Sequence, residues 1–381
     1  MPAFRFELNR LPPEAEALRA EVREFLSDAL ADFPAHERAR TWFGVDTEFS
    51  RKVAERGWIG MTWPRAYGGS GRSVLERFVV IEEMLAAGAP VAAHWMADRQ
   101  SGPLLLRFGS EEQKKRILPG ICRGETYFCI GMSEPDSGSD LASVRARATR
   151  TSDGWRLSGT KLWTSGAAMA HFMVGLFRSD EAERQAGLSQ FLIPMDTPGI
   201  EVRPIRDLSG SDHFCEVVFD DAELPSDALI GEEGAGWAQA MAELAYERSG
   251  PERYLSCHPL LEETVRTLAA GTDARAEEAI GRQWARVATL RAMSTSVAGL
   301  LAAGEAPDLE AAVVKDLGAV HEQGQPGVVQ ELLGLAPSRE TDAEVVQKML
   351  AHLVTNAPSF SLRGGTREIL RGIIARGLGL R

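Results

Sequence analysis

Residues 131–140 read Gly-Met-Ser-Glu-Pro-Asp-Ser-Gly-Ser-Asp and form the most informative stretch of the chain. Small residues and Gly138 permit close approach of the backbone, and Ser133 and Ser139 offer hydroxyl groups beside backbone N–H groups. Such a loop can hold a pyrophosphate or the polar edge of a ring without a lysine. It also fits an ordinary turn between a helix and a sheet. A second Gly-Ser-Asp, at residues 210–212, lacks these neighbours, so the tripeptide alone has little specificity.

A second motif follows about twenty residues later, where residues 159–165 read Gly-Thr-Lys-Leu-Trp-Thr-Ser. A tryptophan among hydroxyl-bearing residues at the end of a strand can form one wall of a site for a flat aromatic cofactor. Taken alone, however, Trp163 is better explained as a core residue that caps a β-sandwich. The motif therefore needs support from the rest of the chain.

The segments around these motifs are typical of β-structure. They are short and rich in β-forming residues, and Gly, Pro, Asp and Ser separate them, which favours an antiparallel sandwich or barrel. They cover residues 155–159, 172–177, 191–194 and 215–219.

The chain on either side of this β region is predicted to be helical. Apolar residues recur at intervals of three and four over residues 13–30 and 74–87, and Ser110 is a suitable N-cap for a further helix. A turn-rich loop at residues 57–71 separates these elements. From about Gly236 the chain is rich in Ala, Leu and Glu with few helix breakers, which predicts a bundle of long helices.

Length and composition limit the class of protein. The chain has 381 residues, and at about 150 residues per domain it is expected to form two or three domains. Hydrophobic residues make up 44% and charged residues 25%, as in globular proteins. The formal net charge of −12 repels phosphate backbones and argues against nucleic-acid binding. No apolar run approaches the roughly 18 residues that span a bilayer, so we expect no membrane span.

The cysteines, histidines and glycines exclude several common sites. The four cysteines form no Cys-x-x-Cys pair, and the seven histidines form no His-Glu-x-x-His pair, so neither a disulfide scaffold nor a metal site is predicted. Residues 154–161 do not meet the order of a P-loop, and residues 234–236 lack the third glycine of a dinucleotide fold. Residues 1–11 lack the apolar core of a signal peptide. These features predict a cytoplasmic chain with reduced thiols.

Four segments, in the same order along the chain, resemble the signatures of the acyl-CoA dehydrogenase family. Two are the motifs at residues 131–140 and 159–165. The third is a loop that contains Gly57-Trp58, Trp63-Pro64 and Tyr67-Gly68-Gly69, and the fourth reads Gly-Gly-Thr-Arg-Glu-Ile-Leu-Arg at residues 364–371, followed by Ile374-Ala375-Arg376. The resemblance covers nearly the whole chain.

The resemblance implies an α+β fold of the acyl-CoA dehydrogenase type in three parts. These are an N-terminal all-α domain at residues 1–124, a central antiparallel β domain at residues 125–232, and a C-terminal four-helix bundle at residues 233–381. The family holds FAD between the last two parts.

The resemblance also implies a reaction, which is FAD-dependent α,β-dehydrogenation of an acyl-CoA thioester to the trans-2-enoyl-CoA. A base removes a proton from Cα while a hydride leaves Cβ for flavin N5. Donors must also stabilise the charge that develops on the thioester oxygen. An electron-transfer flavoprotein-like acceptor is expected to take the electrons, and acyl carrier protein could replace CoA.

The matched positions assign roles to individual residues. The expected cofactor contacts are Ile130, Met132, Ser133, Trp163, Ser165, Thr366 and Glu368. The expected substrate contacts are Ser139 and Arg248, although a structural salt bridge explains Arg248 equally well.

The catalytic base is expected at Glu247. The family's commonest arrangement has a glutamate two residues before the threonine of its last motif, but this chain has Gly364 there. A second arrangement in the family places the glutamate on the first helix of the C-terminal bundle, just before an arginine, and Glu247 precedes Arg248. The competing explanation is a solvated acidic helix face, because Glu243 lies four residues earlier.

Two departures from the family pattern affect the FAD contacts. The usual Arg-x-Gln-Phe-Gly element is absent from residues 259–267, and the glycine-rich segment expected in mid-bundle is replaced at residues 328–334. Contacts at the adenine end are therefore altered or supplied by a partner chain. We expect a homo- or hetero-oligomer, either a dimer or a tetramer. Such gaps, together with Gly364, resemble heteromeric members that act on branched, long or polycyclic acyl groups.

Two other functions remain open from the sequence. One is a non-catalytic subunit that scaffolds a heteromeric dehydrogenase. The other is an oxidase or flavin monooxygenase on the same fold.

Overall fold

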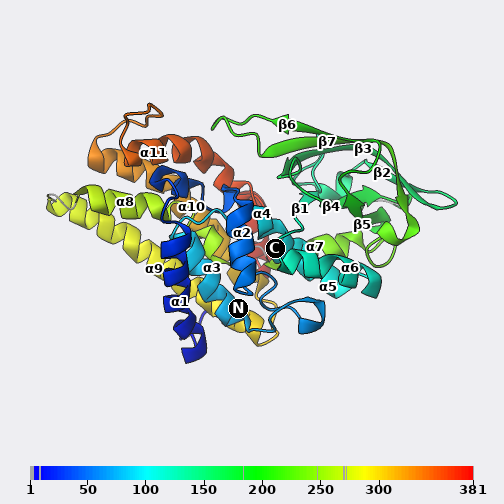
Figure 1. Ribbon diagram of the computed structural model, residues 1–381, viewed down its shortest axis with the longest axis horizontal. Coiled ribbons are helices and arrows are strands. Elements are labelled where there is room, and N and C mark those ends of the chain that lie inside the picture. Colours follow the sequence, from blue (N-terminus) through cyan, green and yellow to red (C-terminus); the bar gives the residue numbers. More distant parts are fainter. Residues whose placement is uncertain are drawn as a thin grey trace. The chain divides into compact units, whose positions relative to one another are not determined.

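The computed structural model describes residues 4–7, 10–182, 184–246, 248–268, 271 and 273–380. Its residues divide into two compact units. The first unit consists of Met1–Phe49, Arg72–Ala92 and Glu247–Arg381, and the second consists of Ser50–Gly71 and Ala93–Tyr246. The predicted order of helical, β and helical regions is confirmed (Figure 1). No helix within the described residues is long and apolar enough to cross a membrane.

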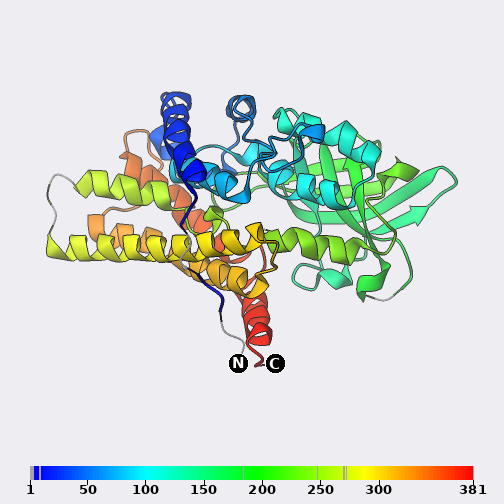
Figure 2. The ribbon, with the colours of Figure 1, turned by 90° about the horizontal axis from the view of Figure 1, so that it is seen from below.

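The first unit is built from helices. Its α-helices are α1 (Pro13–Ala29), α3 (Val74–Ala86), α8 (His258–Leu268), α9 (Ala274–Ala302), α10 (Asp308–Leu333), α11 (Val345–Asn356) and α12 (Arg367–Gly377). Short 3₁₀ turns η1 (Ala35–Phe43), η7 (Pro251–Arg253) and η8 (Ala357–Ser361) lie between them. Helices α9 and α10 run alongside each other, and α12 packs on α10 (Figure 2). Apolar side chains of α8, α10 and α11, including Leu260, Val329 and Leu350, form one core cluster.

Local sequence explains where two of the predicted helices begin. Helix α3 starts with a reciprocal capping box, in which Ser73 accepts from the backbone of Glu76 and the Glu76 side chain accepts from the backbone of Ser73. Ser110 and Gln113 form the same motif at the start of α6 (Glu111–Cys122), so the predicted N-cap at Ser110 is confirmed. Each motif satisfies backbone N–H groups that the first helical turn leaves without partners.

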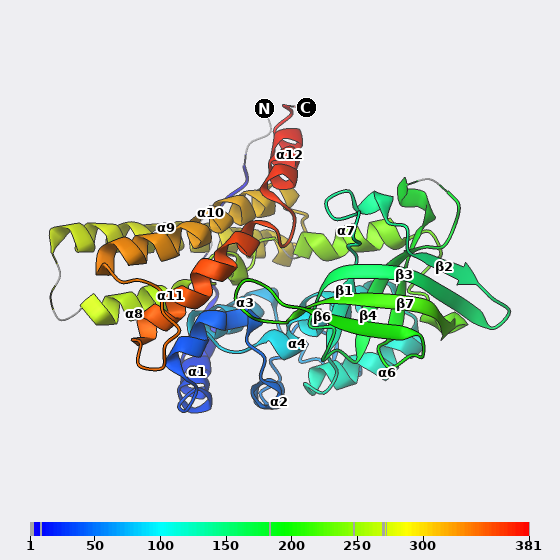
Figure 3. The same ribbon diagram turned by 90° about the horizontal axis from the view of Figure 1, so that it is seen from above.

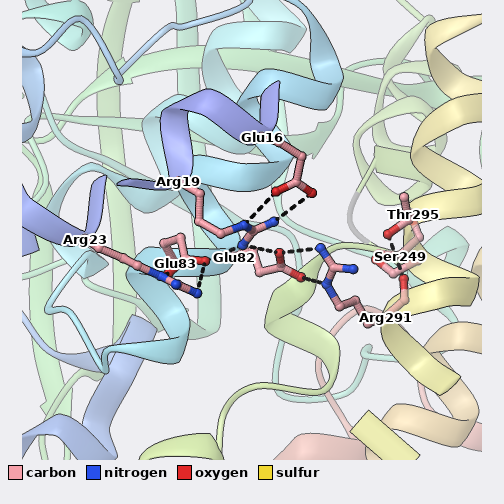
Figure 4. Close-up of polar contacts among 9 residues, drawn as sticks. Glu16, Arg19, Arg23, Glu82, Glu83, Ser249, Arg291 and Thr295 are labelled. Carbon is pink, nitrogen blue, oxygen red and sulfur yellow. Dashed lines mark hydrogen bonds and ion pairs between the residues drawn. The ribbon is translucent and has the colours of Figure 1, made fainter. Parts of the chain in front are cut away.

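A cluster of buried charge joins α1, α3 and α9 (Figure 4). Arg19 donates to Glu82 at 2.9 Å and also contacts Glu83, and Arg23 donates to Glu83 at 2.7 Å. Arg291 of α9 donates to Glu82 from another direction at 2.6 Å, and this hydrogen bond raises the pKa of Arg291. Because both carboxylates are buried, their arginine partners fix how these three helices pack.

The long-helix prediction after Gly236 is only partly correct. Helix α7 (Gly236–Tyr246) ends well before α8 begins, and the short turn η7 lies between them. The sequence Gly250-Pro251 explains this break, because proline lacks the N–H that would continue a helix. Glu247 lies outside the described residues, so its place on a helix stays a prediction.

The second unit combines a sheet with helices. Its seven described strands are β1 (Phe128–Gly131), β2 (Arg147–Arg150), β3 (Gly154–Ser165), β4 (Phe172–Arg178), β5 (Leu188–Pro194), β6 (Ile200–Ile205) and β7 (Phe214–Pro225). The strand order is β1-β4-β2-β3-β7-β6, and β5 pairs with β4. Strands β3, β7 and β6 are seen side by side in Figure 3. Its helical elements are α4 (Ala92–Met96), the π-helical turn η3 (Ala97–Ser101), α5 (Gly102–Phe108), α6 and α7, and α2 (Thr47–Glu55) runs into this unit from the first.

Most of the sheet is antiparallel, as predicted, but its edge at β1 is not. The ladders β2–β3, β3–β7, β6–β7 and β4–β5 are antiparallel. Strand β1 instead pairs with β4 in parallel. The single residue pair between β2 and β4, at Arg147 and Arg178, is also parallel. The difference is possible because the long connection between β1 and β4 lets the chain return in the same direction. Buried aromatic residues, among them Trp155, Phe177 and Phe191, fill one face of the sheet.

Candidate functional site

The first motif begins where β1 ends. Ile130 pairs with Val174 of β4, and Gly131 is the last residue of the strand. A Cβ atom at Gly131 would lie 2.5 Å from the Met173 sulfur and 3.2 Å from Lys161 Cγ, so a larger residue would force the Met173 side chain to shift. The chain then leaves the sheet through Met132 and Ser133, which are both half-buried.

The rest of the motif is a tight loop. The backbone N–H of Glu134 donates to Ser137 at 2.7 Å, and that of Ser137 donates back to Glu134 at 3.1 Å. The Ser137 hydroxyl donates to the carbonyl oxygen of Asp140 at 2.8 Å. Ser139 is exposed at the rim of this loop. Apart from its two chain neighbours, no atom of the described residues lies within 4 Å of a Cβ at Gly138, so packing against them does not require that glycine.

The second motif contains a distorted stretch of β3. The register between β3 and β7 shifts between Lys161 and Thr164, and Trp163 has a positive φ of 60°. Such a conformation is strained for a tryptophan, and a bulge of this kind turns a side chain away from its regular position. Trp163 is 55% exposed, and its ring meets Phe214 edge to face at 5.8 Å. The core position suggested for Trp163 alone is therefore wrong.

The structure brings the two motifs together. The backbone N–H of Leu162 donates to the carbonyl oxygen of Ser133 at 2.8 Å. One residue earlier, Lys161 donates to the Glu134 carboxylate at 2.8 Å, and both side chains are buried. Trp163 thus follows directly after the two residues, Lys161 and Leu162, that contact the Met132–Ser133 backbone. The lysine–glutamate pair was not predicted, although both residues belong to the quoted motifs.

Several hydroxyl groups lie beside this junction. Ser133 and Ser165 are half-buried, and within the described residues neither hydroxyl makes a hydrogen bond. The Thr164 hydroxyl is buried and likewise has no partner among the described residues. An exposed aromatic face, a close backbone and unused hydroxyls fit the flat ring and polar edge of a flavin. The chemistry of these residues is therefore suited to hold the FAD that the sequence resemblance implies.

The C-terminal motif belongs to the first unit. Thr366 is the N-cap of α12, and its hydroxyl accepts the backbone N–H of Ile369 at 3.5 Å. Glu368 is exposed in the first helical turn, where its own backbone N–H and the Thr366 side chain lower its pKa. Arg248 is half-buried in the same unit. Glu247, the expected base, lies outside the described residues.

Cations surround Gly364, the position of the family's usual base. A Cβ atom there would lie 3.0 Å from Nη2 of Arg253 and 3.5 Å from Cε of Lys315. Both basic residues are fully buried, and Lys315 donates to the carbonyl oxygen of Phe360 at 2.7 Å. Gly364 also has a positive φ of 68°, which disfavours any larger residue. Sequence inspection missed this setting because Arg253 and Lys315 lie far from Gly364 along the chain.

Metal ligation finds no support in the described part of the chain. No group of three or more His, Cys, Asp or Glu side chains there could hold a metal ion. The described site is thus one of hydroxyls, backbone groups and an aromatic ring.

Comparison with known proteins places these features in a family. A model of the N-terminal domain of acyl-CoA dehydrogenases matches residues 12–125, and a model of the middle domain matches residues 129–222. Acyl-CoA dehydrogenase IpdE1 of Mycobacterium tuberculosis is 33% identical, and the match covers 96% of this chain and 98% of that protein.

Solved structures agree with this result. The Tcur3481-Tcur3483 steroid ACAD superposes with a TM-score of 0.87 at 28% identity, over 98% of both chains. The ChsE4-ChsE5 complex from Mycobacterium tuberculosis gives a TM-score of 0.84 at 26% identity, over 98% of this chain and 99% of that one.

Proposed function

The chain belongs to the acyl-CoA dehydrogenase family, and we propose that it binds FAD and oxidises the Cα–Cβ bond of an acyl-CoA thioester to the trans-2-enoyl thioester. The observation that carries the proposal is Trp163, which is exposed in a strained conformation beside the Ser133 loop. Strain of this kind persists only where the surrounding structure enforces it, and it is frequent at functional sites.

The chain would hold the cofactor through its two signature motifs and its C-terminal segment. Trp163 would form a wall of the ring site, and the hydroxyls of Ser133 and Ser165 would offer polar contacts. Ile130 and Met132 would line the same site, and Thr366 and Glu368 are the proposed cofactor contacts of the C-terminal segment. Bound FAD would supply the acceptor for the hydride that leaves Cβ.

Glu247 is the proposed base. It would accept the α-proton of the thioester, so its carboxylate becomes a carboxylic acid as the hydride departs from Cβ. Two observations support this position. Gly364 provides no carboxylate at the usual position, and α7 ends at Tyr246, the residue immediately before Glu247. Ser139 and Arg248 are the proposed contacts to the substrate.

The proposed substrate carries a bulky acyl group, such as a polycyclic one. The resemblance to family members that act on bulky acyl groups supports this class, because glycine stands at position 364 in place of the usual glutamate. The similarity to a structure named as a steroid ACAD supports the same class. CoA is the proposed carrier, and acyl carrier protein is the alternative.

We further propose that the active form contains a second chain of the same fold. The missing Arg-x-Gln-Phe-Gly element leaves part of the expected adenine contacts to a partner, and a similar structure is named as a complex of ChsE4 with ChsE5.

The electron acceptor would be an electron-transfer flavoprotein. All four cysteines are buried and form no disulfide, which supports a cytoplasmic location.

Anaerobic flavin reduction tests this function. The purified protein, alone and with candidate partner chains, would be mixed with straight-chain, branched and polycyclic acyl-CoA thioesters. We expect the oxidised-flavin absorbance to fall fastest with a bulky thioester and an enoyl thioester to form. A colourless protein that cannot be reconstituted with FAD would favour the scaffold function. Rapid hydrogen peroxide formation on turnover in air would favour an oxidase.

A further inference from the structure

A buried ion pair lies beneath the junction of the two motifs. The Lys161 side chain is fully buried and that of Glu134 is 7% exposed, with Nζ 2.8 Å from Oε1. Removing two charges from water is expensive, and an apolar pair in the same place is often equally stable or more stable. Stability alone is therefore a poor reason for this pair, and its contacts point to another one.

The Glu134 carboxylate connects three segments. Besides Lys161 of β3, it accepts the backbone N–H of Arg145 at 2.7 Å and that of Ala146 at 3.0 Å. Those two residues lead into β2, whereas Glu134 itself belongs to the loop after β1. Its position is therefore fixed by backbone groups as well as by the lysine, and the loop is fixed with it.

Lys161 holds the other side of the junction. Its ammonium group lies 3.4 Å from the carbonyl oxygen of Met132 and 4.7 Å from the centre of the Phe177 ring. The next residue, Leu162, donates its backbone N–H to Ser133. The irregular turn of β3 at Trp163 follows at once, so Lys161 is the last regular residue before it.

We propose that Lys161 and Glu134 are positioning residues, which hold the Met132–Ser133 backbone and the strained Trp163 in the arrangement that receives the flavin ring. The pair touches neither cofactor nor substrate in this account and acts through the groups that do. This inference rests on the proposed flavin site. It extends that proposal to two residues for which the sequence suggested no role.

The test compares three forms of the protein. Lys161→Met removes the cation and leaves Glu134 buried without it, so this variant is also expected to be less stable. The double variant Lys161→Met/Glu134→Gln removes both charges and relieves the stranded carboxylate. Arg156→Met is the matched control, because Arg156 forms an exposed pair with Glu223 at 3.1 Å on the same strand.

Each form would be measured for thermal stability of the apoprotein, FAD dissociation constant and visible absorption and circular dichroism of the bound flavin. We expect the double variant to regain stability, yet to bind FAD roughly tenfold more weakly with an altered flavin spectrum. The control should match the wild type in all three. A double variant with wild-type FAD affinity and spectrum would overturn the inference, even if the single variant fails to fold. A wild-type protein that binds no FAD would instead refute the proposed function, and this inference with it.

Discussion

The loop–strand junction at Ser133 and Trp163 differs from the segment around Gly364, although both carry signatures of the same family. At the junction the buried charges of Lys161 and Glu134 pair with each other, and the buried Thr164 hydroxyl has no hydrogen-bond partner within the described residues. The two side chains nearest a Cβ at Gly364 are the cations Arg253 and Lys315, and the buried Glu252 carboxylate lies 3.7 Å from Arg253. No carboxylate stands at position 364 itself, where the family's usual base is expected. The C-terminal motif thus keeps the family signature, although Gly364 lacks the carboxylate that the usual base provides. The proposed dehydrogenation would therefore need a base at another position.

The largest expected effect comes from removing the proposed base. Glu247→Gln keeps the size of the side chain but cannot accept a proton, so flavin reduction should slow by roughly 10²–10⁴ while FAD stays bound. Glu243→Gln, four residues earlier, is the matched control and should change the rate little. Rapid-mixing measurement of flavin reduction checks both. A Glu247→Gln protein that reduces its flavin at the wild-type rate would show that the base lies elsewhere.

The same comparison predicts that the base cannot be moved to position 364. Adding Gly364→Glu to Glu247→Gln should restore little of the lost rate, because the nearby cations of Arg253 and Lys315 would lower the pKa of the new carboxyl group and make it a weaker base. The positive φ of Gly364 adds strain. Substantial recovery of flavin reduction in the double variant would contradict the expected effect of these two cations.

The charge cluster of Figure 4 should contribute to stability and not to the flavin site. Glu82→Gln weakens the contacts to Arg19 and Arg291, so the free energy of unfolding should fall by about 1.5–3 kcal/mol. Denaturant unfolding measures this loss. The spectrum of bound flavin should stay unchanged, and a clear spectral shift would mean that this cluster, too, shapes the cofactor site.

Replacing the exposed tryptophan should have a smaller effect. Trp163→Ala removes an aromatic wall whose ring contacts contribute about 0.5–1.5 kcal/mol, so FAD should bind roughly three- to tenfold more weakly. Because Trp163 is exposed, the apoprotein should keep its stability. Equilibrium dialysis and thermal unfolding provide the two values. Loss of stability with unchanged FAD affinity would favour a purely structural role for Trp163.

The smallest expected effect is a pH dependence at the junction. Burial lowers the pKa of Lys161 to about 8, although Glu134 opposes this shift. Above that pH the unfolded chain keeps a proton that the folded chain has lost, so stability gains with rising pH from this group. Relative to Lys161→Met, the wild type should gain about 1 kcal/mol between pH 8 and pH 9. Parallel unfolding curves for the two proteins would contradict this assignment.

Sequence reasoning found the elements with strong local signals. The helices at residues 13–30 and 74–87 and four strand segments were predicted because periodicity and capping are local properties. Strands β1, β2 and β6 were missed because they are short, and β1 also pairs with a distant strand, β4. The parallel pairing of β1 with β4 could not be read from spacing at all.

The candidate site was predicted from family motifs more than from physical rules. Ser133 and Trp163 were named, but the exposure of Trp163 follows from a register shift that no local pattern reveals. Lys161 and Glu134 were quoted without a role, since 27 residues separate them along the chain. The cations beside Gly364 were missed for the same reason, because three separate segments bring them together.

Anaerobic mixing with a polycyclic acyl-CoA is the decisive experiment for the proposal that this chain, with its FAD bound, oxidises a bulky acyl-CoA thioester. We expect the oxidised-flavin absorbance to fall and one enoyl thioester to form for each flavin reduced. A protein that carries FAD, alone or with its partner chain, but is reduced by no thioester of the straight-chain, branched and polycyclic panel would contradict it.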